Sequence, residues 1–493
     1  MPKTLLSSAL LLALSAAAAA QQGETLIDFG QSQNQKTIQI NQGGSYRLTG
    51  TSDKAQVWVN TGDEKVTLIL DNLNLSNDFG SAIYIESSGD AKVILSANSK
   101  NTLMDAKHGE YAENQAQQNA PLYAKSDLKI EGESGALLTV IGRYKDGIVS
   151  KDDLDLRDAT ITIEAADDAL YGKDSVDIRG SVLSLKAGDD GIKSDNIERE
   201  DKGFVHIDGS QITLHVQSDA IHAPNLIDLK ASKINIEHSE EGIESKNITI
   251  HSGDIYVYSL DDAINIADGS GNERGEPGFF NRMADQFTSR EDRDGRPPRE
   301  ERREERGQGR GEGRGDGQRG GRGGKKALDG TVSLLGGRLH IRSEGDGFDS
   351  NGNAIMSGGE LLIEGPSSNR DGYIDVDGTF DLTGGHLLAM GSSGMAQAPS
   401  ESSTQPIIQV NAAQTYPANA KLVISEVGGQ YRYQQTMPTT FASFTVSTPE
   451  LELGKIYSIH INDERITEVK LEQMVTRFGN GGRHSKGNRA SWW

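Results

Sequence analysis

The sequence predicts an all-β protein: a right-handed parallel β-helix with coils of about 22 residues, followed by a small C-terminal β-domain or cap. Three observations predict this fold. An acidic motif recurs at a nearly fixed step, two rows of apolar residues recur with the same steps, and short segments between turns alternate apolar and polar residues. No long segment shows a period of 3.6 residues, which argues against helical repeats such as ankyrin or tetratricopeptide units.

The first row is the motif Asp-[Gly/Ala]-[Ile/Leu], with Glu once in place of Asp. Its steps are 22, 22, 29, 22 and 21 residues, and its acids are Asp146, Asp168, Asp190, Asp219, Glu241 and Asp262. Two apolar rows repeat the last four of these steps, one through Leu156, Ile178, Ile207, Leu229 and Ile250 and the other through Ile161, Leu183, Ile212, Ile234 and Ile255. Rows that share one irregular series of steps indicate coils stacked in register.

Two insertions interrupt the repeat. The step of 29 contains about seven additional residues near Asn196 to Lys202, and the next motif acid after Asp262 is Asp346, 84 residues later. The excess corresponds to residues 269–326, a stretch rich in Arg, Gly and Glu that cannot bury a core, and we expect it to be a disordered loop. A last match is expected at Asp371.

The ends of the chain differ from the repeat. Residues 1–20 combine Lys3, a short apolar run and Ala18-Ala19-Ala20, which predicts a signal peptide cleaved near Ala20 and a secreted, periplasmic or cell-surface protein. No later stretch is long and apolar enough for a membrane helix. We expect the β-helix over residues 21–395, a β-rich region over 396–475, where the period stops, and a flexible tail over 476–493.

Composition excludes several function classes. The chain has 50 Lys and Arg against 72 Asp and Glu, a net charge of −22, which argues against the main body binding nucleic acid. It has no Cys, which excludes disulfides, thiolate metal sites and cysteine nucleophiles. Composition does not exclude partners that are cationic or that bind through cations.

Stacking places the motif acids along one edge, and several have an acidic neighbour just before them. Ca²⁺ binds six to eight oxygen atoms with irregular geometry and would relieve the repulsion in such a row. The candidate metal ligands are Asp146, Asp167, Asp168, Asp189, Asp190, Asp219, Glu241, Asp261 and Asp262. Asp before Gly is also an ordinary turn signature, in which the side chain binds backbone N–H groups and Gly takes a positive φ. Both interpretations remain open.

Asn and Lys residues follow the motif acids at fixed offsets. Asn196, Asn225 and Asn247 each stand six residues after a motif acid and predict a structural Asn ladder. The candidate carbohydrate-binding residues are Lys151, Lys173 and Lys193. A lyase would need a base near the C5 proton of a uronate, which Lys151 or Lys173 could supply. Because the same acidic pair recurs from coil to coil, no residue is assigned a catalytic role.

The chain resembles, over roughly residues 40–465, the carbohydrate-binding right-handed β-helix proteins, which are similar in fold to pectate lyases. The resemblance is carried by VTLILDN at 66–72, AIYI at 82–85, DGIVSKDDL at 146–154, AGDDGIKS at 187–194, GSSGMAQAP at 391–399 and VSTPEL at 446–451. It implies export, Ca²⁺ bound along the acidic edge, and binding of acidic or plant cell-wall polysaccharides without demonstrated cleavage.

Three functions are therefore considered. The favoured one is an exported, non-catalytic polysaccharide-binding protein that holds acidic, polygalacturonate-like glycans through Ca²⁺. With only three Trp in the chain, we expect polar contacts rather than a stacking platform. The alternatives are a Ca²⁺-dependent uronate lyase or hydrolase and a structural or adhesive surface protein.

Overall fold

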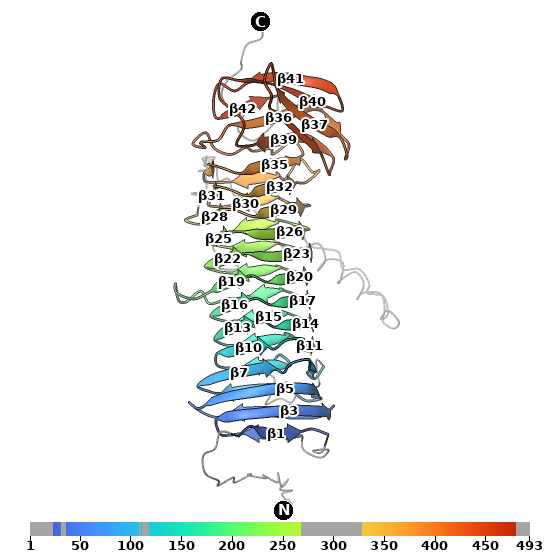
Figure 1. The fold of residues 1–493 in the computed structure, drawn as a ribbon, viewed down its shortest axis with the longest axis vertical. Coiled ribbons are helices and arrows are strands. Elements are labelled where there is room, and N and C mark those ends of the chain that lie inside the picture. Colours follow the sequence, from blue (N-terminus) through green and yellow to red (C-terminus); the bar gives the residue numbers. More distant parts are fainter. Residues whose placement is uncertain (1–22, 31–35, 108–109, 111–117, 268–327, 480–493) are drawn as a thin grey trace, which may run out of the picture.

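The computed structural model describes residues 23–30, 36–107, 110, 118–267 and 328–479. These residues form a long column of stacked coils, with the N-terminal strands at one end and a β-rich region at the other (Figure 1). The predicted signal peptide and the predicted loop at 269–326 lie outside the described residues. In the described part of the chain, no helix is of the length and apolarity needed to cross a bilayer.

Each regular coil contributes one strand to each of three parallel stacks. Stack 1 is a 12-stranded sheet of mostly short strands, so the chain turns sharply on both sides of it. Its strands are β2 (Thr37–Ile40), β4 (Gln56–Asn60), β6 (Ile83–Ser87), β9 (Leu122–Ala124), β12 (Ile148–Ser150), β15 (Leu170–Gly172), β18 (Ile192–Lys193), β21 (Ile221–Ala223), β24 (Ile243–Ser245), β27 (Ile264–Ile266), β30 (Phe348–Ser350) and β33 (Ile374–Val376).

Stacks 2 and 3 follow stack 1 in each coil. Stack 2 contains β7 (Asp90–Leu95), β10 (Leu128–Gly132), β13 (Asp153–Arg157), β16 (Ser175–Arg179), β19 (Phe204–Asp208), β22 (Leu226–Lys230), β25 (Asn247–Ile250), β28 (Thr331–Leu334), β31 (Asn353–Met356) and β34 (Phe380–Leu382). Stack 3 contains β8 (Lys100–Met104), β11 (Leu137–Gly142), β14 (Thr160–Ala165), β17 (Val182–Ala187), β20 (Gln211–His215), β23 (Ser232–His238), β26 (Gly253–Ser259), β29 (Arg338–Ser343), β32 (Glu360–Glu364) and β35 (His386–Gly391).

The two stacks merge at the N-terminal end of the column. There the coils begin with β1 (Thr25–Asp28) and the long strands β3 (Gly44–Ser52) and β5 (Lys65–Ser76). Because β5 pairs with both β7 and β8, stacks 2 and 3 belong to one 26-stranded sheet.

The observed strand register confirms the three rows read from the sequence. Ile148 pairs with Leu170 in stack 1, Leu156 with Ile178 in stack 2, and Ile161 with Leu183 in stack 3. The pairing continues across the gap in the repeat, where the row of Ile264 resumes in the next strand. A shift of one residue would turn every apolar side chain outward, which is why the apolar spacing determines the register.

The expected last match at Asp371 is wrong by one residue. Phe348 pairs with Ile374, so Gly372 takes the position of the motif acid and Asp371 precedes it. The backbone N–H of Gly372 accordingly donates to Asp346 Oδ1 at 2.5 Å. The irregular spacing of the repeat allows either Asp371 or Gly372 at the motif position. The apolar residue that faces the core, Ile374, shows that the position belongs to Gly372.

The core is one continuous column of Ile, Leu and Val that points inward from all three stacks. Side chains such as Leu156, Ile178 and Ile248 are 0% exposed. Burial of a side chain of this size stabilises the fold by about 1.5–3 kcal/mol relative to exposure. The repeating coils therefore form a rigid support on which the turns are held at fixed spacing.

The C-terminal region closes the column with a second core. It contains β36 (Ile407–Tyr416), β37 (Lys421–Glu426), β38 (Arg432–Thr436), β39 (Phe441–Ser447), β40 (Ile456–Ile461), β41 (Glu464–Lys470) and β42 (Val475–Phe478). Strand β39 pairs antiparallel with β35, the last strand of stack 3, so the open end of the sheet is covered. Strand β42 includes residues 476–478 of the expected tail, whose residues from 480 onward lie outside the described part.

Candidate metal and carbohydrate-binding site

The motif acids occupy the turns that lead from stack 3 into stack 1, a line that we call the acidic edge. It is formed by Asp146, Asp168, Asp190, Asp219, Glu241, Asp262 and Asp346, each two residues before a strand of stack 1. Asp146, Asp168 and Asp190 each accept at Oδ1 the backbone N–H of the motif acid in the next coil, at 3.4, 3.0 and 3.0 Å. These carboxylates are therefore turn formers that link the coils.

Burial makes ionisation of these acids costly. Asp146 and Asp168 are 5% and 6% exposed. Burial, reinforced by neighbouring carboxylates, raises the pKa of Asp146 to about 7 and that of Asp168 to about 8. Burial also raises the pKa of Asp262, further along the edge, to about 9. Negative charge is crowded here, and a cation placed beside these groups would favour their ionised forms.

Lys193 already supplies one such cation. Its Nζ lies 2.7 Å from Asp190 Oδ2 and 3.3 Å from Asp168 Oδ2. Burial alone would lower the pKa of Lys193, but the two carboxylates raise it above its ordinary value. In turn, burial opposes ionisation of Asp190, yet Lys193 holds the pKa of that carboxyl below its ordinary value. Lys193 is thus bound within the protein.

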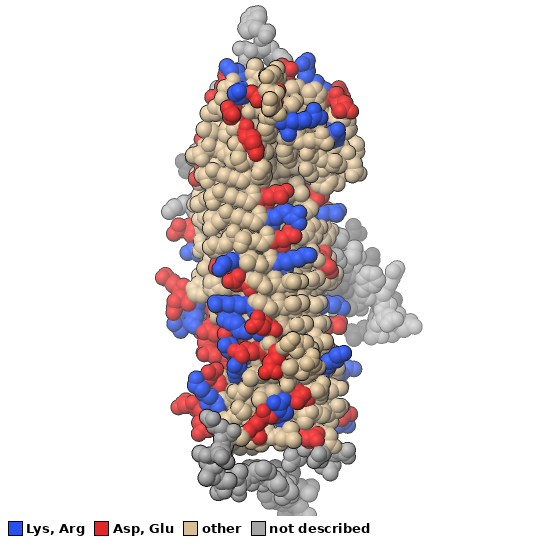
Figure 2. All heavy atoms as spheres, viewed as in Figure 1, with Lys and Arg blue, Asp and Glu red and all other residues tan. Residues whose placement is uncertain are grey.

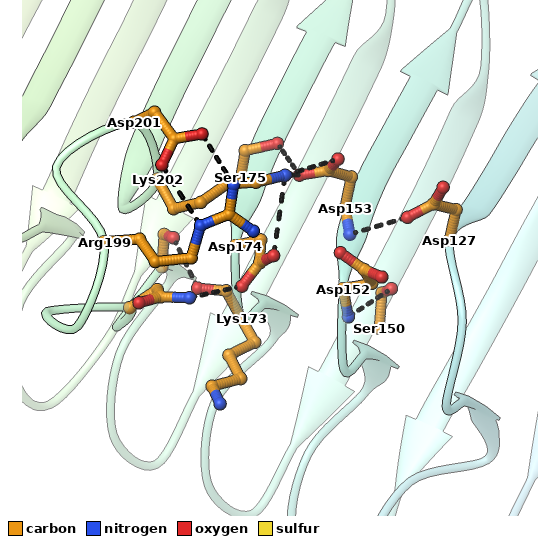
Figure 3. A network of polar contacts seen from close by, with 12 residues as sticks. Asp127, Ser150, Asp152, Asp153, Lys173, Asp174, Ser175, Arg199, Asp201 and Lys202 are labelled. Atoms are coloured by element: carbon orange, nitrogen blue, oxygen red, sulfur yellow. Dashed lines mark hydrogen bonds and ion pairs between the residues drawn. The ribbon is translucent and has the colours of Figure 1, made fainter.

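The other two predicted sugar-binding lysines are placed differently. Lys151 Nζ lies 4.3 Å from the ring centroid of Tyr171 and 5.9 Å from that of Tyr123, and burial lowers its pKa. Lys173 directs its ammonium group away from the neighbouring acids Asp152 and Asp174 (Figure 3). Lys173 is consequently the better placed of the two to reach a bound anion.

Asp167, Asp168 and Asp189 come together on two adjacent coils of the acidic edge. One carboxylate oxygen from each lies within 4.8 Å of the other two. Asp167 and Asp189 are partly exposed, whereas Asp168 is buried. An all-oxygen donor set on a partly open turn fits Ca²⁺, which accepts carboxylates together with water or sugar oxygens. Lys145 Nζ, 3.3 Å from Asp167 Oδ2, adds a cation at the rim of this group.

The remaining predicted ligands are distributed along the edge. Asp262 Oδ1 accepts the backbone N–H of Asp346 at 2.9 Å, and Glu241 Oε2 accepts the side-chain N–H of Asn265 at 2.9 Å. Asp261 is exposed. Asp219 faces His222, described below. The predicted ligands therefore share one edge but do not converge on one point.

Gly147 and Gly191 of the motif are favoured for a reason other than the predicted positive φ. A Cβ atom on Gly147 would lie 2.6 Å from the backbone oxygen of Ala169, and one on Gly191 would lie 2.5 Å from that of Ala220. Neither Gly147 nor Gly191 is among the residues with positive φ. Close approach of the next coil, and not a left-handed turn, selects the small residue.

A second acidic group, which sequence reasoning missed, lies on the other side of stack 1. Asp127, Asp152 and Asp153 each offer a carboxylate oxygen within 4.8 Å of the others. Lys202 bridges Asp153 at 3.1 Å and Asp174 at 3.5 Å, so part of this network is already neutralised (Figure 3). The available signal was position: Asp152 and Asp174 stand six residues after a motif acid.

That position also carries the expected Asn ladder. Asn247 donates its side-chain N–H to the backbone oxygen of Asn225 at 3.0 Å, and Asn225 donates to that of Lys202 at 2.5 Å. Asn196 donates to Asp174 Oδ1 at 2.5 Å. These hydrogen bonds make the ladder structural. In the coils nearer the N-terminus, Asp152 and Asp174 take the same position.

An aromatic row on stack 1 was also missed. Trp58, Tyr84 and Tyr123 are paired in register, with centroid distances of 4.9 and 5.8 Å between successive rings. Tyr84 and Tyr123 are each 4% exposed, so the rings are covered rather than open for stacking. The sequence carries a signal for this row, because each aromatic residue directly follows the first apolar residue of its stack 1 strand.

Charge on the face seen in Figure 2 is mixed: Asp and Glu are interleaved with Lys and Arg over its middle and lower parts. Arg157, for example, lies 2.9 Å from Asp177 across adjacent strands of stack 2. Such alternation is typical of a solvated sheet face and not of a surface that attracts nucleic acid.

The chain is similar to known carbohydrate-binding domain-containing proteins. Residues 34–276 match the family model for carbohydrate-binding domain-containing proteins. A carbohydrate-binding domain-containing protein of Acetivibrio thermocellus is 34% identical over 221 residues, which cover 44% of this chain and 77% of that relative. A solved structure, a gadolinium derivative of the polysaccharide lyase-like protein from C. thermocellum, is 27% identical and covers 50% of this chain and 97% of that one, with a TM-score of 0.40. The chain belongs to the carbohydrate-binding domain-containing protein family.

Proposed function

We propose that this protein is an exported, non-catalytic binder of acidic, polygalacturonate-like polysaccharides and that Ca²⁺ bridges the sugar carboxylates to the acidic edge. One observation carries the proposal: the carboxylate oxygens of Asp167, Asp168 and Asp189 lie within 4.8 Å of one another. Three carboxylates leave several of the six to eight Ca²⁺ positions for water and for uronate oxygens.

The neighbouring lysines support an anionic ligand. The side chain of Lys145 is 48% exposed beside Asp167, and the ammonium group of Lys173 points away from Asp152 and Asp174 (Figure 3). Neither lysine has the double ion pair that holds Lys193. Both could contact uronate carboxylates that are not bridged by the metal. For an extracellular Ca²⁺ site, the expected affinity is about 0.1–1 mM.

Affinity electrophoresis in gels containing polygalacturonate tests the proposal. The purified full chain should be retarded in Ca²⁺ and should migrate freely in EDTA. Asp167→Asn combined with Asp189→Asn should abolish the retardation. Asp208→Asn is the matched control. Asp208 is an acid on stack 2, away from the acidic edge, and it pairs with Lys230 at 3.4 Å. Retardation that survives EDTA or the double variant contradicts Ca²⁺ bridging. Free migration in both gels favours neutral glycans or an adhesive role.

A lyase is the second candidate, and one observation favours it. Burial lowers the pKa of Lys151, and Asp146 of the acidic edge is one of its charged neighbours. Such an amine could remove the C5 proton of a uronate, after which a C4–C5 double bond forms and the C4 oxygen leaves. The absorbance of the unsaturated product, followed in the same mixtures, decides between the two. A flat trace supports binding alone, whereas a rising trace that is lost in Lys151→Met establishes a lyase.

A further inference from the structure

A buried histidine stands between two carboxylates next to the acidic edge. His222 lies in β21 and pairs in register with Glu244 of β24 in the next coil. Asp219 is the motif acid three residues before His222. Neither His222 nor Glu244 was expected to bind a ligand.

The three side chains converge on one point. One ligand atom from each lies within 4.8 Å of the other two. His222 Nδ1 is 3.4 Å from Asp219 Oδ2 and 3.7 Å from Glu244 Oε1. Both distances exceed an ordinary N–H···O hydrogen bond, which is about 2.7–3.2 Å.

The histidine nitrogen is inaccessible and has no hydrogen bond. His222 is only 9% exposed, and within the described structure its Nδ1 is a buried atom with no hydrogen-bond partner. A buried polar atom left without a hydrogen bond carries an uncompensated desolvation cost. Something that binds Nδ1 and both carboxylates at once would remove this cost.

Negative charge is crowded around the group: burial alone would lower the pKa of His222, but the neighbouring Asp219 raises it above its ordinary value. Burial raises the pKa of Glu244 to about 10 and that of Asp219 to about 7. The adjacent cation in the stack 1 row, Lys193, is held by Asp190 and Asp168 of the preceding coils.

We propose that Asp219, His222 and Glu244 form a binding site for a divalent transition-metal ion of the Zn²⁺ class. Ligands bound to Zn²⁺ at about 2.1 Å in tetrahedral geometry are about 3.4 Å apart, close to the separations of 3.4 and 3.7 Å between His222 Nδ1 and the two carboxylates. The imidazole nitrogen favours Zn²⁺, Co²⁺ or Ni²⁺ over Ca²⁺, which takes oxygen ligands. Three protein ligands leave one position for water or for a sugar oxygen.

This site is separate from the proposed Ca²⁺ group at Asp167, Asp168 and Asp189 and does not depend on it. The alternative without a metal is that His222 is a protonated ring that neutralises Asp219, as Lys193 neutralises Asp190. The two differ in one property: only the metal site gives saturable Zn²⁺ binding that depends on His222.

Isothermal titration of the full chain with Zn²⁺, and the absorption spectrum of the Co²⁺ form, test the proposal. We expect one site with a tetrahedral Co²⁺ spectrum and a loss of Zn²⁺ affinity of at least about 100-fold in His222→Ala, since even partners of a ligand cost 10–100-fold. Glu244→Gln should weaken binding similarly. His251→Ala, which removes a ring paired with Asp228 at 2.7 Å on stack 2, is the matched control and should bind normally.

Several results would overturn the proposal. They are Zn²⁺ binding unchanged in His222→Ala, binding lost in His251→Ala, or full competition by equimolar Ca²⁺. Anomalous diffraction at the zinc edge from crystals of the unmutated chain decides the matter if the variants do not fold. Retardation by polygalacturonate in Ca²⁺ should persist in His222→Ala, so failure of this site and failure of the proposed function are distinguishable.

Discussion

Replacement of Lys193 by Met tests whether the acidic edge depends on a buried ion cluster. Lys193 Nζ lies 2.7 Å from Asp190 Oδ2 and 3.3 Å from Asp168 Oδ2, and the Asp190 side chain is 2% exposed. Removal of one partner from a buried ion pair costs about 3–5 kcal/mol because the remaining charge stays out of water. We expect Lys193→Met to lose about 3–5 kcal/mol of unfolding free energy at pH 8.

The loss should depend on pH, with a sign set by the carboxyl groups. In the wild type, burial opposes ionisation of Asp190, but Lys193 holds its pKa below the ordinary value. Without Lys193, burial raises that pKa above the unfolded value, so the folded variant binds a proton that the unfolded chain releases. The unfolding free energy of the variant then falls as pH rises above about 4. Its deficit should be smaller at pH 5 than at pH 8.

Guanidinium unfolding followed by circular dichroism at the two pH values measures the deficit. Lys186→Met is the control from the preceding coil: Lys186 pairs with Glu164 at 3.0 Å, but their side chains are 63% and 65% exposed. The control should lose less than about 1 kcal/mol. Asp190→Asn added to Lys193→Met should restore part of the loss, since it removes the stranded charge. A deficit below about 1 kcal/mol, or one equal at both pH values, refutes the reasoning.

Three further predictions concern the coils and their acids. Gly191→Ala should lower the free energy of unfolding by about 1–3 kcal/mol, because the added Cβ would lie 2.5 Å from a backbone oxygen of the next coil. Gly209→Ala, whose Cβ would have nothing within 4 Å, should lower it by about 1 kcal/mol through its positive φ alone. Urea unfolding of the two variants measures the difference. Ile207→Ala should cost about 2–5 kcal/mol by the same measurement, because the side chain is 1% exposed, and a cost under 1 kcal/mol would contradict a packed core. In EDTA, the free energy of unfolding should fall from pH 5 to pH 8. Burial raises the pKa of Asp146 to about 7 and that of Asp262 to about 9, so the folded state keeps protons that the unfolded state releases. A rise in the free energy of unfolding over this range would contradict the prediction.

The coil architecture could be predicted because it depends on the spacing of apolar residues along the chain. Register in a parallel stack follows from which side chains point inward, and Leu156, Ile178 and Ile207 repeat that choice in successive coils. The seven extra residues enter the turn before β19, so they change no pairing. Asp371 was misplaced because Asp371-Gly372 matches the start of the motif in residue type, and only the pairing of Phe348 with Ile374 shows that Gly372 holds the motif position.

The site could be predicted only in part, because its contacts join different coils. The sequence places the motif acids on one edge, but whether an acid is paired also depends on residues of neighbouring coils, as Asp168 depends on Lys193. Lys193, His222 and Glu244 occupy the same position in three successive coils of stack 1. A row read three residues after each motif acid would have shown the Lys, His and Glu together. It would not have shown which of them are bound by neighbours.

The two interpretations of the motif acids, turn former and cation ligand, are compatible because each carboxylate has two oxygens. Oδ1 of Asp190 accepts the backbone N–H of the next coil, while its Oδ2 binds Lys193. Asp168 divides its oxygens in the same way. In these two acids, one oxygen therefore links successive coils and the other binds the Lys193 ammonium group. Lys193 supplies the positive charge at Asp190 and shares Asp168 with the group proposed to bind Ca²⁺. Asp219 instead faces His222 Nδ1, which has no hydrogen bond, and this is where we propose a transition-metal ion.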